Sequence, residues 1–560
     1  MNRIQEPLKL KANFRTLMIP AIVGLVLFLL LQIVLPTAAD PELQTSVVIT
    51  KEEASLAASK FAKDQLGFPV EEATETLVTY QSNSALYGYL TKEKKLDEYN
   101  KTYEQQYPYD VFRVRFTLPG LDALLVDVHM QTAAVISYTL DAAHSSYDRI
   151  ELNTGAVRRE MLLLAEGNMT LSEKQALAEP WLQRSGYDPA SLELLTQEGE
   201  PKLEYADPSK SVLDAQLKLE FTFEDRQLRS YQQAFDVPEQ HTAYVEKQTQ
   251  NALMLTLIGY GLFTLVLGIL AIVYSVKTRA HTSFKRGVFL ALLLFVIQML
   301  NTYNLMPVFK AQGMSSFGIA FMMIFYVIYS LIFSALLYFS LVGGDGLWRK
   351  EDGLNVWPRA KEPGYGPYVL DSMKLGYLWA FILLGIQSII FIILSLTLNT
   401  WATTDSEQSP YNMLYPWLFP LMAWFAGISE EAVYRLFGIK MVKKIVRSTF
   451  VASLITSIIW ALGHTLYPIY PIISRPIELV IIGLLFSYIF LRYGYLTAMF
   501  AHVIFNSTLM GISLILLRDA TNVVMGAFYI ALPALVAYVI YRFNPQKKEK
   551  PYTTTPPEAL

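Results

Sequence analysis

The sequence contains no cysteine, and this absence removes several classes of chemistry. Without a thiol the chain has no disulfide framework, no thiolate nucleophile and no cysteine-ligated metal. Charged residues are also scarce at 17%, whereas soluble domains carry about a quarter. No basic tract is present, so we expect no nucleic-acid partner. The composition therefore argues against a soluble protein of ordinary type.

Apolar residues take the place of the missing charge. They make up 53% of the 560 residues, and the mean hydropathy is +0.30. The chain is too long for one ordinary domain. These features predict an all-α polytopic membrane protein with about ten transmembrane helices, with an inserted extracytoplasmic α+β domain after the first helix.

The first apolar run, Leu17 to Pro36, follows four basic residues and precedes a long polar region. It is long for a signal peptide, so we interpret it as an uncleaved anchor; cleavage near Ala38 or Ala39 is the alternative. Further spans are expected near 252–276, 287–305, 316–341, 375–399, 413–438, 450–467, 476–491, 495–516 and 521–541. Every second connection between them is rich in Lys and Arg.

The positive-inside rule predicts the orientation of the protein from this alternation, because loops rich in Lys and Arg lie in the cytoplasm. It places both termini in the cytoplasm and residues 37–250 outside, in a multi-pass protein that we assign to a bacterial plasma membrane. The predicted layout is a cytoplasmic N-terminus (1–16), an anchor (17–36), an extracytoplasmic region (37–250), transmembrane helices (251–345), a cytoplasmic connection (346–374), an intramembrane core (375–541) and a cytoplasmic tail (542–560).

The polar region shows the same order of elements twice. A helix-forming stretch, "KEEASLAASKFAKDQLGF", precedes the alternating runs "YDVFRVRFTL" and "ALLVDVHMQTAAVISYTL". Later, "TLSEKQALAEPWLQRSGYD" precedes "AQLKLEFTFED" and "SYQQAFDV". We expect two copies of a small α+β module, which loosely resemble the PepSY modules of bacterial envelope proteins.

Three charged residues interrupt an apolar run at "GISEEAVYRLFGIK". A charge at the centre of a spanning helix costs about 2.5–3.5 kcal/mol, and Glu430 lies about 15 Å above the lysines at the end of the run, roughly half the hydrocarbon thickness. Glu431 and Arg435 are four residues apart and can pair, whereas Glu430 points elsewhere. A structural ion cluster that locks helix packing is the alternative interpretation.

Two histidines also fall inside predicted spans, and each has a partner one helical turn away. "WALGH" places Trp460 before His464, and "HVIFN" places Asn506 after His502. A lone histidine in a helix is most often a packing residue. Together with Glu430, the two histidines make three unusual polar positions on separate helices within a short stretch of chain, which indicates a shared polar site in the bundle interior.

The residue types suit hydrolysis of a peptide bond without a covalent intermediate. A carboxylate shielded from water can serve as a general base, and an imidazole with an amide donor can stabilise an oxyanion. Glu430, His464 and His502 could equally hold a divalent metal such as zinc. No HExxH helix is present, which argues against the site-2 class of metalloproteases.

The three motifs resemble those of the CAAX prenyl protease and bacteriocin-processing (CPBP, or Abi) family. "EEAVYR" matches its EExxxR motif, "WALGH" its second motif, and "HVIFN" its HxxxN motif. The resemblance covers roughly residues 375–541. It implies a helical intramembrane peptidase in which Glu430 is the essential base, His464, His502 and Asn506 complete the site, and Glu431 and Arg435 support it.

The resemblance implies a CAAX endopeptidase-like enzyme that is either glutamate- or metal-dependent and acts on a peptide or membrane protein in the lipid bilayer. Bacteria generally lack prenylation, so a prenylated substrate is not expected. The alternative is a non-proteolytic protein of the same fold that acts as a binding, immunity or regulatory factor. A proton or substrate pathway would also use intramembrane Glu and His, but no inverted repeat supports it.

Overall fold

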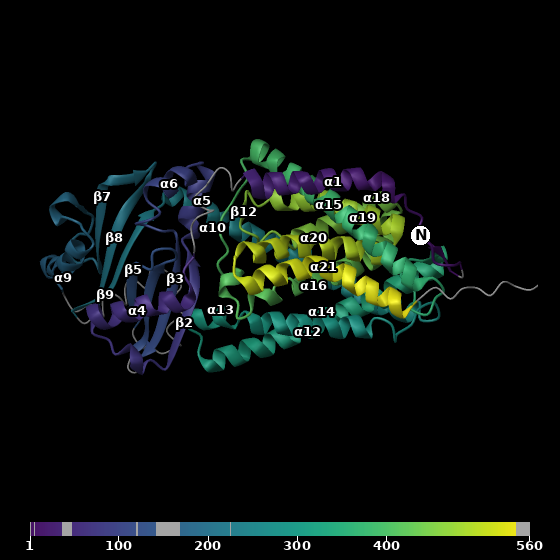
Figure 1. The fold of residues 1–560 in the computed structure, drawn as a ribbon, viewed down its shortest axis with the longest axis horizontal. Helices are drawn as coiled ribbons and strands as arrows, with labels where there is room; N and C mark the ends of the chain where they lie inside the picture. The colour runs from purple at the N-terminus through teal and green to yellow at the C-terminus, as the bar shows by residue number, and fades with distance from the viewer. Residues whose placement is uncertain are drawn as a thin grey trace, which may run out of the picture.

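The computed structural model describes residues 2–4, 6–35, 48–118, 121–141, 169–224 and 226–544. Figure 1 shows two parts, a sheet-rich domain at one end of the long axis and a helical bundle that fills the rest. The residues at 36–47 that would carry a signal-peptide cleavage site, and most of the predicted tail, lie outside the described residues.

The sheet-rich domain is built on one antiparallel sheet of eight strands in the order β2-β3-β4-β5-β9-β8-β7-β6. The strands are β2 (Glu75–Ser82), β3 (Asp110–Leu118), β4 (Leu121–His129), β5 (Val135–Asp141), β6 (Glu193–Leu194), β7 (Lys202–Val212), β8 (Ala215–Glu224) and β9 (Gln227–Asp236). Strands β5 and β9 join the two halves. Each half thus runs outward from the centre to its own edge.

A helix precedes each half of the sheet. Helix α4 (Lys51–Leu66) begins with a reciprocal cap between Thr50 and Glu53, and α9 (Leu171–Arg184) begins with the same cap between Thr170 and Glu173. The shorter helices α5 (Ser84–Lys92) and α6 (Leu96–Thr102) follow β2. The predicted order of helix and strands is therefore present in both halves, while their relation to PepSY modules stays a prediction.

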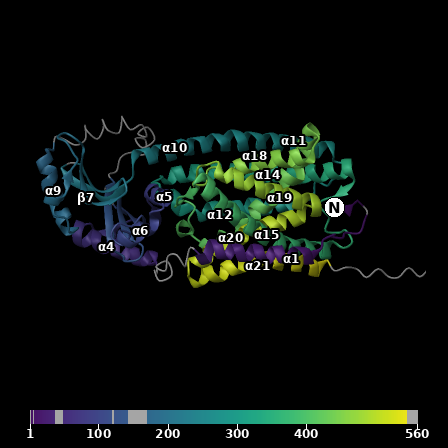
Figure 2. The ribbon, with the colours of Figure 1, turned by 90° about the horizontal axis from the view of Figure 1, so that it is seen from above.

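The bundle consists of apolar helices that run along the long axis of the molecule (Figure 2). Eight helical stretches among the described residues are long and apolar enough to cross a membrane, so this is a multi-pass membrane protein. They are Phe14–Val34, Glu239–Lys277, Val288–Ala311, Ser316–Asp352, Tyr365–Leu398, Ser474–Tyr493, Tyr495–Leu516 and Ala520–Phe543. The first of them comprises α1 (Phe14–Leu29) and a π-helical end.

The second stretch leaves the sheet-rich domain directly after β9. It consists of α10 (Glu239–Met254), the π-helical η4 (Leu255–Leu262) and α11 (Phe263–Lys277). The third contains α12 (Val288–Asn304) and α13 (Met306–Ala311). The remaining five stretches are α14 (Ser316–Asp352), α15 (Tyr365–Leu398), α19 (Ser474–Tyr493), α20 (Tyr495–Leu516) and α21 (Ala520–Phe543).

Two apolar segments accompany these eight. One consists of α16 (Leu421–Glu430), the π-helical η7 (Glu431–Ile439) and α17 (Lys440–Val446), and the other is the short α18 (Thr449–Leu462). The expected number of about ten spans and the outer position of the sheet-rich domain remain predictions.

Several helices begin or end at other residues than the expected spans, and each difference has a physical cause. Helix α15 begins at Tyr365 and not near 375, because it extends beyond its apolar part. Helix α14 continues to Asp352, which shortens the predicted connection of 346–374. Helix α16 begins only at Leu421, because prolines at 410, 416 and 420 confine the preceding residues to short turns. Helix α18 ends at Leu462, directly before Gly463.

The sheet-rich domain is docked on one end of the bundle by the segment between α15 and α16. The Asn412 side chain accepts a hydrogen bond from the Tyr80 backbone N–H at 2.7 Å and donates one to the Tyr80 carbonyl at 2.8 Å. The Asn412 amide thereby bonds the N–H and the C=O of one residue of β2, as a neighbouring strand would. Tyr411 packs beside it on the Tyr80 ring, with ring centroids 5.7 Å apart.

Candidate active site

The two adjacent glutamates lie at the junction of α16 and η7 and have different surroundings. Glu430 is the last residue of α16, and its side chain is 22% exposed. Glu431 opens the π-helical turn, and its side chain is fully buried. Wide π-helical turns occur often at functional sites. The local geometry therefore turns one carboxylate into the protein and leaves the other accessible.

Glu431 joins two helices through one carboxylate oxygen. Its Oε1 accepts hydrogen bonds from Arg435 Nη1 and from His502 Nδ1, both at 2.9 Å. The pairing of Glu431 with Arg435 is the one expected from their spacing, and both side chains are fully buried. Because an ionised carboxylate only accepts, His502 donates from Nδ1, and Nε2 is the nitrogen that the neutral form of the ring leaves unprotonated. That nitrogen lies 3.8 Å from Glu430 Oε2.

Trp460 on α18 lies between the other members of the site. Its indole N–H donates a hydrogen bond to Glu430 Oε2. Its ring stands edge-on to His464 and His502, at centroid distances of 5.2 and 5.9 Å. The Arg435 guanidinium lies 4.5 Å from the centroid of the same ring. A single indole thus fixes the accessible carboxylate and separates it from the buried arginine.

His464 follows the end of α18 and is only partly buried. Its Nδ1 lies 3.0 Å from the Trp460 carbonyl oxygen and donates to it, which leaves Nε2 free. Its ring stacks nearly parallel on Tyr467, with an interplanar angle of 10°. The two histidines therefore have the same tautomer, set by an acceptor on Nδ1 in each case.

Asn506 lies one turn after His502 on α20 and is partly exposed. Among the described residues nothing forms a hydrogen bond with its amide. Since an amide inside a membrane protein is costly when unpaired, a free amide at this place is more consistent with a ligand-facing role than with packing.

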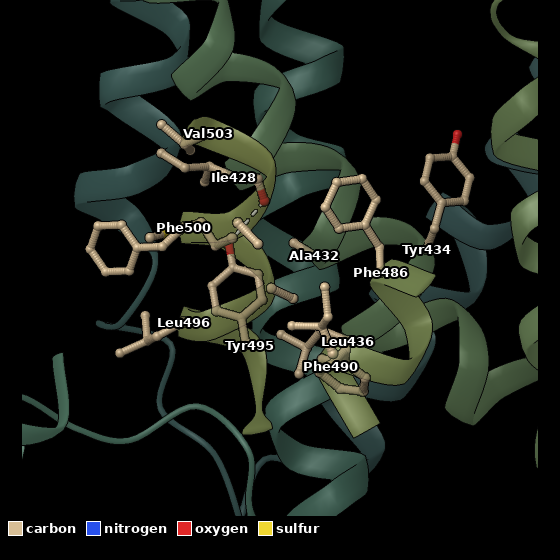
Figure 3. Close-up of a cluster of buried hydrophobic side chains, with 14 of the residues drawn as sticks. Ile428, Ala432, Tyr434, Leu436, Phe486, Phe490, Tyr495, Leu496, Phe500 and Val503 are labelled. Atoms are coloured by element: carbon tan, nitrogen blue, oxygen red, sulfur yellow. Dashed lines mark hydrogen bonds between the residues drawn. The ribbon is translucent and has the colours of Figure 1, made fainter. Parts of the chain in front are cut away.

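Apolar and aromatic side chains pack against the buried part of the site. Phe486 of α19 stacks on His502, with ring centroids 4.5 Å apart. The Tyr495 hydroxyl donates a hydrogen bond to the Ile428 carbonyl at 2.9 Å, and this bond is drawn in Figure 3 amid the packed side chains of α16, η7, α19 and α20. Phe486, Tyr495 and Ile428 are themselves buried, so this part of the site is closed to solvent.

Sequence reasoning missed a second buried carboxylate nearby. Glu478 of α19 is fully buried, and it accepts hydrogen bonds from Arg475 Nη1 at 2.5 Å and Gln387 Nε2 at 2.6 Å. The Arg475 guanidinium lies 5.2 Å from the centroid of the Tyr467 ring, on which His464 stacks. The signal was present, because "RPIELV" places an acid in an apolar run, as "SEEAVYR" does.

The structure places Glu431, Arg435, Trp460, His464 and His502 around Glu430, and Asn506 lies one turn after His502 on α20. A metal held by Glu430, His464 and His502 stays a prediction. No group of three His, Cys, Asp or Glu side chains among the described residues is placed to hold a metal ion. We therefore derive no step through a metal.

The comparison with protein families bears on this same stretch. Residues 412–508 match the family model "Type II CAAX prenyl endopeptidase Rce1-like". The resemblance to CPBP-family proteases is thereby confirmed for this Rce1-like segment, which begins at the docking residue Asn412 and contains all seven site residues. The match supports a peptidase of the CAAX endopeptidase type. No curated protein matches the chain, and neither does any solved structure.

Proposed function

We propose that the protein is an intramembrane endopeptidase that hydrolyses a peptide bond of a membrane-associated protein or peptide. The observation that carries the proposal is the split between the two glutamates. One is locked by Arg435 and His502, and its neighbour Glu430 is accessible, close to two imidazoles that present free Nε2 atoms.

In the proposed reaction Glu430 acts as general base on a water molecule. The water oxygen forms a bond to the carbonyl carbon of the substrate, and its proton passes to Glu430. The C–N bond then breaks, and the proton moves from Glu430 to the departing amine. His464 and His502 orient the water through their Nε2 atoms, and the free amide of Asn506 donates to the oxyanion. Atoms and charge balance without a further reagent.

Electrostatics favour this division of roles. The Arg435 charge is compensated by Glu431, so the arginine stabilises the buried cluster without neutralising the base. The hydrogen bond from Trp460 fixes one oxygen of Glu430 and leaves the other for water. Burial of the Glu431 and Arg435 side chains strengthens their ion pair relative to the same pair in water.

The test compares membranes from cells that carry wild-type protein, Glu430→Ala, or no protein. General-base catalysis contributes about 10²–10⁴-fold, so we expect peptide termini that appear with wild type and are lost with Glu430→Ala. Glu179→Ala, at an exposed position of α9, is the matched control and should behave as wild type.

One outcome would contradict the proposal. Identical termini in wild type and Glu430→Ala, both different from the deletion, would mean that the protein acts by binding, as in the immunity or regulatory alternative. A second arm of the experiment adds a metal chelator and distinguishes the two routes to hydrolysis. Cleavage that is lost on chelation and restored by zinc would assign a role to a divalent metal. Cleavage that is retained would assign activation of the water to Glu430 without a metal.

A further inference from the structure

The segment that carries His464 is anchored by a helix from outside the Rce1-like match. Thr465 Oγ1 donates to the Ala252 carbonyl at 3.0 Å and lies 2.9 Å from Thr256 Oγ1. At the other end of the segment, the Ile472 N–H donates to Gln248 Oε1 at 3.0 Å. All three partners lie on α10 and η4, the helix that leaves the last strand of the sheet-rich domain.

The same helix is packed tightly against the backbone next to His464. A Cβ atom on Gly463 would lie only 2.5 Å from the Tyr260 ring of η4, so the ring touches the peptide backbone itself. At the residue before Tyr260, a Cβ on Gly259 would lie 2.5 Å from the Leu462 side chain. With so little free space, a displacement of the helix moves the backbone of residues 462–465 as well.

Trp401 connects this segment to the sheet-rich domain by a second route. It forms the short strand β11 (Trp401–Ala402), which pairs with β12 (Ile469–Tyr470), and its indole stacks on Tyr470 with centroids 4.7 Å apart. On its other side a Cβ atom on Gly88 of α5 would lie 2.7 Å from the indole. The His241 ring of α10 lies 5.4 Å away. One side chain thus touches α5, α10 and the His464 segment.

We propose that Thr465 and Trp401 are positioning residues for His464, through which the sheet-rich domain sets the rate of peptide hydrolysis. The role in hydrolysis rests on the proposed function, whereas the mechanical link does not. The His464 imidazole takes its direction from a backbone that Thr465 fixes one residue away. A misplacement of about 1 Å can cost about 10²-fold in rate, so small movements at this junction are sufficient.

Thr465→Val tests the first link. Valine keeps the shape and removes the hydroxyl that meets Ala252 and Thr256. We expect kcat to fall about 10–100-fold with KM unchanged, and Thr465→Ser to restore it. Thr302→Val is the matched control, because this buried threonine bonds only within its own helix, to the Gln298 carbonyl at 3.0 Å. Equal effects of Thr465→Val and Thr302→Val would overturn the proposal.

Gly88→Ala tests the route from the domain without altering any membrane helix. Alanine favours the α5 helix by about 1 kcal/mol relative to glycine, so a loss of rate could not come from a weakened helix. The added methyl group must displace Trp401. We expect a fall in kcat of about 3–10-fold, and none with Leu56→Ala on the exposed face of α4.

A labelling experiment separates this inference from the proposed function. Because the chain has no cysteine, His464→Cys introduces a unique thiol whose alkylation by a small maleimide reports the mobility of the segment. We expect Thr465→Val and Gly88→Ala to raise the alkylation rate several-fold, and Thr302→Val to leave it unchanged. Faster alkylation, combined with the absence of cleavage by the wild-type protein that retains His464, would keep the link and reject the peptidase. Unchanged alkylation would reject the link.

Discussion

Two buried charge clusters in the bundle look alike in composition but differ in how completely their atoms are paired. The first cluster contains Glu431, Arg435 and His502. The second lies where α14 approaches its end and contains Asp345 with Arg349 and Arg286. The central carboxylate of each is fully buried.

In the second cluster both carboxylate oxygens are occupied. Asp345 Oδ1 accepts from Arg349 Nε at 2.8 Å, and Oδ2 accepts from Arg286 Nη1 at 2.9 Å and Thr282 Oγ1 at 3.1 Å. The Arg286 guanidinium also lies 3.9 Å from the Trp357 ring centroid and donates to its carbonyl. This cluster is saturated, as a purely structural ion pair should be.

The first cluster is not saturated. Glu431 Oε2 and Arg435 Nε are buried and have no hydrogen-bond partner among the residues that the structure describes. It also adjoins the partly exposed Glu430, His464 and Asn506. Incomplete pairing next to accessible polar atoms distinguishes a functional cluster from a structural one, and the comparison can be tested by substitution.

Glu431→Gln should have the largest total effect, because it changes both fold and function. It leaves the buried Arg435 without a countercharge, which for a broken buried pair costs about 3–5 kcal/mol. It also weakens the acceptor that fixes the His502 tautomer. We expect a lower unfolding midpoint in detergent and a lower kcat per folded molecule. A variant with normal kcat would contradict a role for Glu431 in orienting His502.

Asp345→Asn should destabilise by a comparable amount, about 3–5 kcal/mol, but without a catalytic effect. Two arginines would then share one neutral amide. The measurement is the thermal unfolding midpoint of Asp345→Asn together with its cleavage rate per folded molecule. A normal midpoint combined with a lost cleavage rate would reverse the assignment of the two clusters.

Asn506→Ala should affect catalysis alone. Loss of one oxyanion donor costs about 10²–10³-fold in kcat. The unfolding midpoint should stay within the error of wild type, because no hydrogen bond to a described residue is removed. A destabilised Asn506→Ala with unchanged kcat would make the amide a packing element.

The sequence predicted the membrane bundle, the sheet-rich part after the first helix, and the motif residues that lie around Glu430 and Glu431. The catalytic roles of these residues stay a prediction. The differences between sequence and structure lie at helix ends, where hydropathy no longer marks the limits of a helix. Helix α15 starts at Tyr365, before the apolar stretch. Hydropathy does not reveal these first turns, because they contain the charged residues Asp371 and Lys374. The late start of α16 was readable from its prolines, a signal that the hydropathy of the run concealed.

The chain by itself determined which side chains had to be compensated. A charge in an apolar run needs a partner, and spacing within one helix gave Glu431 its Arg435. Only the tertiary structure decided that His502 would share that carboxylate, that Trp460 would hold Glu430, and that α10 would anchor the His464 segment. Such contacts join helices far apart in sequence, and helical periodicity specifies a face of a helix but not the neighbour that covers it.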